Sequence, residues 1–116
     1  MEKIAYELAE NQLVAYNARA IDDFLKPYAD SIKVYTYPNE FQYKGKDKMR
    51  EMYGSFFKAN PKLHCELVSR TVFGNLVIDK EKVTGFANDE ARLLEAIAIY
   101  TVENGKITEV RFMRKK

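Results

Sequence analysis

Four side chains in the middle of the chain could carry out acid–base chemistry: His64, Arg70, Asp79 and Glu81. A two-residue turn at Gly74-Asn75 would pair Arg70 with Asp79, and strand alternation would then place all four on one face of a sheet. A carboxyl group shielded from water has a raised pKa and can act as a general base. His64 would relay protons, and Arg70 would stabilise developing negative charge. We therefore predict these four as candidate catalytic residues.

A plainer interpretation of the same residues remains open. Arg70 and Asp79 would form a cross-strand ion pair on a solvated face, which contributes roughly 0.2–1 kcal/mol. His64 would then be a structural histidine or one at a rim. Strand parity alone favours this plainer interpretation. The grouping depends on the register, because a slip of one residue moves every side chain to the opposite face.

A second hairpin is predicted at Asn104-Gly105, since both residues tolerate the positive φ angles of a type I′ turn. It pairs Ile97 with Phe112 and Glu95 with Arg114. This mainly apolar face is expected to point inward, with Ile97 in a binding pocket and Glu95 near its rim. The reverse face is also apolar and is expected to form a dimer surface; it comprises Leu94, Ala96, Ala98, Tyr100 and Met113.

Further polar side chains are candidates for ligand binding. The hydroxyl groups of Tyr16, Tyr37 and Tyr53 could donate to a ligand carbonyl, although core packing is the simpler role of such aromatics. Gln12 interrupts the apolar stripe of a predicted helix, so it should face either a pocket or a buried partner. Cys65 is interpreted as a small packed hydrophobe.

The periodicity of apolar residues predicts helices followed by strands. Helical spacing covers residues 3–17, a short segment after Asp22-Asp23, and residues 47–58, where Asn60-Pro61 ends the third helix. The strands are expected at 32–37, 41–43, 63–73, 75–85, 92–103 and 106–114.

This order predicts an α+β fold in one domain, residues 1–116. To bury both apolar sets, a mostly antiparallel sheet must curve around three N-terminal helices and form a cone with one open end. With 47% hydrophobic residues, a chain of this length can bury one core.

Composition narrows the classes of partner. The net charge of +2 is too small to indicate nucleic-acid binding, despite a basic C-terminus. The single cysteine permits no internal disulfide, and no Cys or His cluster has metal-ligand spacing, so neither metal nor cofactor is expected. The N-terminal residues lack the apolar run of a signal peptide or membrane span. A soluble, cytoplasmic protein is predicted.

The order of helix, break, short helix and strand over residues 13–35, followed by a helix start at Gly45-Lys46-Asp47, resembles the SnoaL-like branch of the nuclear transport factor 2-like superfamily. The resemblance covers nearly the whole chain. It implies a ketosteroid-isomerase-like cone, also described as a cystatin-like α+β barrel, that encloses a pocket for a small apolar molecule. Polar residues on its middle strands often line that pocket.

The resemblance also bears on one specific activity. Aligning Tyr28-Ala-Asp and Asn104-Gly-Lys-Ile with the ketosteroid isomerases places Gln12, Tyr37 and Ile97 at their three catalytic positions. None of these residues supplies the carboxylate base or the acidic hydrogen-bond donor of that mechanism. Ordinary steroid isomerase activity is therefore not expected.

Two functions remain as hypotheses. The first is a cofactor-free isomerase, cyclase or lyase that uses acid–base chemistry on a small apolar carbonyl compound. The second is a non-catalytic ligand-binding or dimerisation module whose cone is filled by its own side chains. In either case a homodimer is expected. A desolvated titratable group in the cavity would favour the enzyme.

Overall fold

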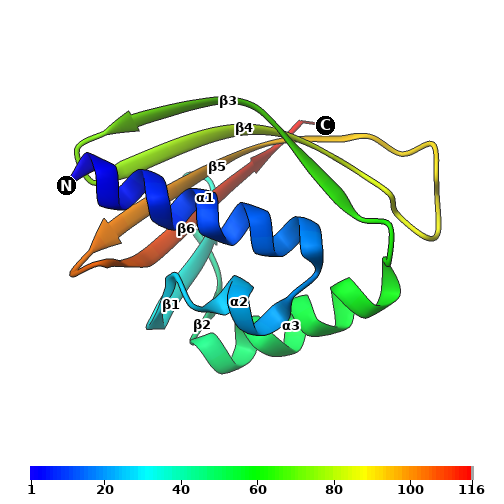
Figure 1. Ribbon diagram of the computed structural model, residues 1–116, viewed down its shortest axis with the longest axis horizontal. Helices are drawn as coiled ribbons and strands as arrows, with labels where there is room; N and C mark the ends of the chain where they lie inside the picture. The colour runs from blue at the N-terminus through cyan, green and yellow to red at the C-terminus, as the bar shows by residue number, and fades with distance from the viewer. Residues whose placement is uncertain (116) are drawn as a thin grey trace.

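Three helices cover the concave face of one curved sheet in the computed structural model, which describes residues 1–115 (Figure 1). The helices are α1 (Glu2–Ala18), α2 (Ile21–Leu25) and α3 (Lys46–Ala59). The first lies along the sheet, and the other two close one end (Figure 1). This arrangement confirms the predicted α+β cone. Within the described part of the chain, no helix combines the length and apolarity needed to cross a membrane.

The sheet contains six strands in the order β2-β1-β6-β5-β4-β3. The strands are β1 (Tyr28–Thr36), β2 (Glu40–Lys44), β3 (His64–Phe73), β4 (Leu76–Thr84), β5 (Leu94–Glu103) and β6 (Lys106–Arg114). Strands β1 and β6 pair in parallel, and all other neighbours are antiparallel. The first strand begins earlier than predicted, because Tyr28 already pairs with Ile107 on β6.

The end of α1 is tied to the start of β3. Arg19 adopts the left-handed conformation that terminates the helix, with φ 52°, and its guanidinium donates to the Leu63 carbonyl at 2.7 Å. The Asn17 side chain accepts from the Cys65 amide at 2.7 Å and donates to the Cys65 carbonyl at 3.0 Å. These contacts fix where β3 enters the sheet.

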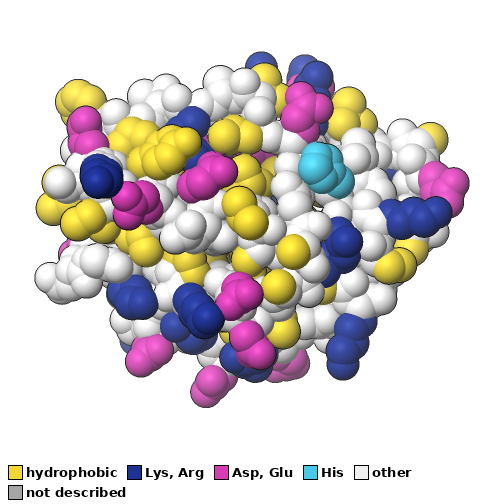
Figure 2. All heavy atoms as spheres, in the orientation of Figure 1, with side chains coloured by type: hydrophobic (Ala, Val, Ile, Leu, Met, Phe, Trp, Pro, Cys, Tyr) yellow, Lys and Arg dark blue, Asp and Glu magenta, His cyan; other side chains and the backbone are white. Residues whose placement is uncertain are grey.

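A β-bulge in β3 changes the predicted faces. The register shifts between Leu67 and Ser69, so Glu81 lies opposite Leu67 instead of Val68. The turn-proximal part of the hairpin keeps the predicted pairing of Arg70 with Asp79. Beyond the bulge the faces are exchanged, and the expectation that His64 shares a face with Glu81 is wrong. His64 is exposed, and the single histidine is visible at the surface in Figure 2.

A second bulge corrects the prediction for β5. The register shifts between Thr101 and Val102, which pairs Ala98 with Phe112 and Ala96 with Arg114. Tyr100 and Ala98 are buried on the concave face. The β5 half of the expected inward face, with Ile97 and Glu95, is therefore on the convex side, whereas its β6 half, with Phe112 and Arg114, does face inward. The predicted dimer surface is wrong for the same reason, since most of its residues lie within the cone.

Aromatic side chains fill the closed end of the cone. Phe24 is almost fully buried, and its ring lies within 6.1 Å, centroid to centroid, of four other rings. These neighbours are Tyr16, Tyr28, Tyr53 and Phe57. Tilted and edge-to-face pairs of this kind are favourable arrangements. They hold α1, α2 and α3 against one another and leave the remaining space nearer the open end.

Candidate active site

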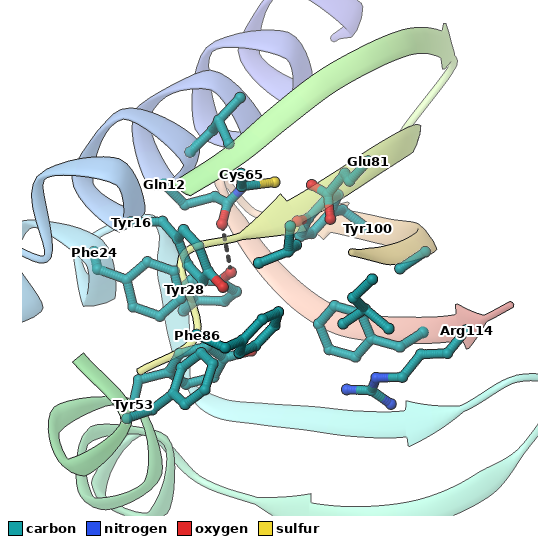
Figure 3. A pocket seen from close by; sticks show the side chains of 16 residues that line it. Gln12, Tyr16, Phe24, Tyr28, Tyr53, Cys65, Glu81, Phe86, Tyr100 and Arg114 are labelled. Carbon is teal, nitrogen blue, oxygen red and sulfur yellow. Dashed lines mark hydrogen bonds between the residues drawn. The ribbon is translucent and has the colours of Figure 1, made fainter. Parts of the chain in front are cut away.

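A cavity of about 110 Å³ lies between the helices and the concave face of the sheet (Figure 3). Its wall is mainly aromatic and aliphatic. The polar side chains that line it come from all parts of the fold: Gln12 and Tyr16 on α1, Tyr28 on β1, Tyr53 on α3, Cys65 on β3, Glu81 on β4, Tyr100 on β5 and Arg114 on β6. A small enclosed space with a few convergent polar groups is typical of a small-molecule site.

Glu81 is the carboxyl group in this cavity wall, and it is only 7% exposed. Burial raises its pKa from an ordinary value of 4.5 to about 7, and the neighbouring charge of Asp79 adds to the rise. A hydrogen bond from the Cys65 thiol and the charge of Arg70 act in the opposite direction. A group with a pKa near neutrality can both accept and return a proton under cellular conditions.

Asp79 occupies the same face of β4 but has a different environment. It is fully buried, and both of its oxygens accept hydrogen bonds from Arg70, at 2.7 Å from Nε and 2.9 Å from Nη2. The third guanidinium nitrogen of Arg70, Nη1, donates to the Glu10 carboxylate on α1 at 2.8 Å. Neither Arg70 nor Asp79 is among the residues that line the cavity. The predicted ion pair exists, but it is buried beneath α1 instead of solvated.

The four predicted catalytic residues are therefore divided among three places. Glu81 lines the cavity, Arg70 and Asp79 form a buried pair beside it, and His64 lies exposed at the start of β3. The buried pair acts on Glu81 through its charges: Asp79 raises the Glu81 pKa, and Arg70 lowers it.

Gln12 has a buried polar partner and also lines the cavity. Its amide nitrogen donates to the Ala9 carbonyl at 3.0 Å, and its oxygen accepts from the Tyr28 hydroxyl at 3.2 Å. Both partners hold the amide in one orientation at the cavity wall (Figure 3). An amide NH₂ has two donors, so one hydrogen remains for a ligand.

Two tyrosines of the predicted ligand set also line the cavity, Tyr16 and Tyr53. Burial raises the pKa of both phenols, to about 12 for Tyr53, and the nearby Glu81 charge adds to the effect. Both hydroxyl groups thus remain protonated near neutral pH and can donate hydrogen bonds.

The remaining predicted ligand residues lie away from this cavity. Tyr37 follows β1 and is 48% exposed. Glu95 forms an ion pair with Lys115 at 3.2 Å, and that contact lowers the Glu95 pKa. Ile97 is on the convex side of β5 with Glu95. The last two were misplaced by the bulge near Thr101, which the turn signal at Asn104-Gly105 did not reveal.

Sequence reasoning also missed several residues of the site. Tyr28 lies outside the strand predicted at 32–37, whereas it begins β1 and its hydroxyl binds Gln12. Arg114 was paired with Glu95 on the expected inward face but was not named as a ligand residue, and it lines the cavity. Cys65 was expected to be a packed hydrophobe; burial raises its thiol pKa, so it remains protonated. Among residues 1–115, no three His, Cys, Asp or Glu side chains are grouped as metal ligands would be.

A wider groove of about 310 Å³ adjoins the cavity. Strands β1 and β2 form one side of it, and α3 forms another. The cavity and the groove share four lining residues, Tyr53, Phe56, Phe112 and Arg114. These side chains separate the enclosed cavity from the more open groove, so the groove is its natural approach.

The fold is that of a small α+β cone with an internal cavity. The model of the SnoaL-like domain matches residues 9–110, and the chain belongs to this family. No curated protein matches the sequence.

Solved structures share this fold over nearly the whole chain. An uncharacterised cystatin-fold protein from Novosphingobium aromaticivorans is 24% identical, with a TM-score of 0.86 over 95% of this chain and 97% of its own. A candidate polyketide cyclase from Bacillus cereus is 23% identical, with a TM-score of 0.79 over 97% and 74%. A candidate ketosteroid isomerase from Kribbella flavida is 13% identical, with a TM-score of 0.84 over 98% and 79%. At these identities the likeness establishes the fold.

Proposed function

We propose that this SnoaL-like protein is a cofactor-independent enzyme that uses Glu81 to transfer a proton on a small carbonyl compound. The observation that carries the proposal is a carboxyl group, 7% exposed, in the wall of an otherwise largely apolar cavity, with a pKa of about 7. Perturbed groups of this kind are concentrated at functional sites. The class of reaction is an isomerisation, cyclisation or elimination that begins with loss of a proton next to a carbonyl.

The cavity supplies the groups that such a step requires. Ionised Glu81 would accept the proton from carbon, and the electron pair of that bond would move onto the carbonyl oxygen as an enolate. The hydroxyl of Tyr16 and the free amide hydrogen of Gln12 would donate to that oxygen. Protonated Glu81 would then return the proton, to the same or to another carbon. No external oxidant or reductant is needed.

The size of the cavity limits the reacting group. An apolar cavity of about 150 Å³ holds one benzene molecule, and the volume here is about 110 Å³. The reacting part of the substrate is thus no larger than a small ring or short chain. A fused steroid does not fit this space, so the proposed reaction is not a steroid isomerisation.

The alternative function is a non-catalytic binding module. The aromatic cluster around Phe24 favours it, because these rings fill the closed end of the cone. Glu81 would then be an acceptor for a ligand hydrogen instead of a base. The homodimer and the cytoplasmic location stay predictions, and a dimer would have to use a surface other than the buried one centred on Ala98 and Tyr100.

Exchange of carbon-bound protons tests the enzyme without knowledge of the substrate. Acetone, cyclopentanone and cyclohexanone would be incubated with the protein in D₂O at pH 7.5, and loss of the α-proton signal would be followed by NMR. The wild type should accelerate exchange of at least one ketone, and Glu81→Gln should reduce that acceleration by about 100-fold or more. Glu66→Gln, at an exposed position of β3, is the control with the same change of charge.

Equal acceleration by wild type and Glu81→Gln would remove Glu81 from the mechanism. Absence of exchange with all three ketones, together with ligand binding in the same cavity, would favour the binding module. Gln has nearly the size and shape of Glu, so both variants should keep the wild-type fold. The ¹H–¹⁵N NMR spectrum of each variant would check this.

A further inference from the structure

Arg114 lies where the enclosed cavity meets the outer groove. It is in the wall of both spaces, although it is the last residue of β6 and close to the chain terminus. Figure 3 shows its side chain extending from β6 toward the side of the cavity where Tyr53 and Phe86 lie. Its guanidinium carbon is 5.5 Å from the centre of the Phe112 ring.

The sheet register aligns Arg114 with Glu81. Glu81 pairs with Ala96 on β5, and Ala96 pairs with Arg114 on β6. These three residues form one row across neighbouring strands, on the concave face. Strands are spaced by about 4.8 Å, so the backbones of Glu81 and Arg114 are roughly 10 Å apart. The side chain of Ala96 is the smallest of the three, so it leaves space between the Glu81 carboxyl group and the Arg114 guanidinium.

Arg114 differs from Arg111 and Lys115, its neighbours near the end of β6, in having no acidic partner among residues 1–115. Arg111, on the convex side of β6, binds Glu109 at 2.7 Å, and Lys115 binds Glu95 at 3.2 Å. Within residues 1–115, no carboxylate lies within ion-pair distance of Arg114. Its positive charge is close enough to the cavity phenols to lower the pKa of Tyr16 and of Tyr53, against the larger effect of burial.

Further cations lie on the convex side of the same end of the sheet. A shallow hollow there is lined by Lys80, Lys115 and the acidic Glu95. The charges of Lys80, Lys82 and Lys115 lower the pKa of Glu95, so these lysines gather on the face opposite the cavity. They add to the long-range attraction of anions to this end of the sheet but do not line the cavity.

We infer that the ligand is a small organic anion, with a carboxylate as the simplest case, which lies over Ala96 with its negative group on Arg114 and its reacting carbon at Glu81. This inference rests on the proposed function and adds the substrate class. The guanidinium fork matches a carboxylate with two parallel hydrogen bonds. A cation on one side and a carboxyl on the other orient the molecule in a single direction.

The two spaces divide the ligand between them. The enclosed cavity of about 110 Å³ takes the ring or short chain that reacts. The groove of about 310 Å³ accommodates any remaining apolar part beyond Arg114. A ligand with its charge buried deep beside Glu81 is disfavoured, because two negative groups would meet there without an intervening cation.

Matched acids and amides test the inference. Benzoate, phenylacetate and 3-phenylpropanoate, each with its primary amide, would be titrated into the ¹⁵N-labelled protein and followed by ¹H–¹⁵N NMR. At least one acid should bind about tenfold or more tightly than its amide, since hydrogen bonds to charged groups are the stronger kind. Its largest shifts should fall on the amides of Glu81, Ala96 and Arg114.

Arg114→Gln should remove this preference for the acid. Arg50→Gln makes the same change of charge on the outside of α3, where Arg50 pairs with Asp22 at 2.7 Å, and should preserve it. Equal binding of acids and amides, a preference that survives in Arg114→Gln, or no binding of any acid would overturn the inference. Each of these results leaves the Glu81-dependent proton exchange of the simple ketones unaffected, so the two proposals can fail separately.

Discussion

Asp79 and Glu81 are two carboxyl groups on the same face of one strand, two residues apart, and their environments are opposite. Asp79 is fully buried and has a guanidinium bound to both oxygens. Glu81 is 7% exposed, has the Cys65 thiol as a hydrogen-bond partner, and has a pKa of about 7. The reactivity of each carboxyl group thus depends less on residue type than on whether a cation is bound to it.

The buried pair and the reactive group are linked by this arrangement. Asp79 and Glu10 bind the Arg70 guanidinium directly, so Arg70 acts on Glu81 only through its charge, which lowers the Glu81 pKa less than burial and Asp79 raise it. Asp79 also raises the pKa of Glu81 by repulsion. In this comparison Asp79 is a positioning residue, and Glu81 is the group that faces a substrate.

Removal of the Asp79 carboxylate should destabilise the protein more than any other change at these carboxyl groups. Asp79→Asn would leave Arg70 buried with only Glu10 as an anionic partner, and loss of one member of a buried pair costs about 3–5 kcal/mol. The free energy of unfolding, measured with urea, should fall by about 3 kcal/mol. Glu10→Gln, at a half-exposed carboxylate on α1, should cost about 1 kcal/mol or less. Equal losses in both variants would contradict the assignment of Asp79 as the principal partner.

A second test uses the pH dependence of stability. The pKa of Glu81 rises from 4.5 to about 7 on folding, so between these values the native state binds more protons than the unfolded state. Stability from this group is therefore fully present below pH 4.5 and is lost as the pH rises through 7. The loss should approach about 3 kcal/mol.

Glu81→Gln should remove this dependence. At pH 8 the variant should be more stable than the wild type, by up to about 3 kcal/mol, because it no longer buries a carboxylate. Urea unfolding from pH 4.5 to 8 measures both curves, and Glu66→Gln is the control. A wild-type curve that is parallel to the Glu81→Gln curve would show that Glu81 has an ordinary pKa.

A third test measures how strongly Asp79 affects the pKa of Glu81. In Asp79→Asn the repulsion on Glu81 disappears and Arg70 loses its strongest partner, and both changes favour ionised Glu81. The pKa of Glu81, followed by ¹³C NMR of its carboxyl carbon, should move below 7. A pKa that does not move in a variant that still folds would show that burial alone sets it.

Much of the fold could be predicted from the sequence. The apolar spacing placed α1 and α3 to within one or two residues, and the turn signals at Gly74-Asn75 and Asn104-Gly105 located both hairpins. Such signals are local, and each is carried by a few neighbouring residues. The cone follows, because helices and strands with these apolar faces have few other ways to bury them.

The site was predicted less well, because its faces depend on two bulges. In the first hairpin, the extra residue Val68 exchanges the inward and outward sets of β3 beyond the bulge. In the second hairpin, the extra residue Thr108 of β6 lies close to the turn and reverses the inward set of β5. No residue type in these strands marks either bulge. The parity argument therefore succeeded between the first turn and its bulge, at Arg70 and Asp79, and failed beyond that bulge and along β5.

Replacement of His64 should have little effect on stability or activity, although strand alternation predicted that His64 lies on the same face as the carboxyl groups. The bulge turns it to the exposed face, so His64→Gln should change the free energy of unfolding by less than about 0.5 kcal/mol. The rate at which the His64→Gln variant exchanges ketone protons should equal that of the wild type at every pH, because an imidazole outside the cavity takes no part in the reaction. If His64→Gln instead altered the pH profile of exchange, His64 would have to face the cavity and take part in proton transfer together with Glu81. The assignment of His64 to the convex face of β3 would then be wrong.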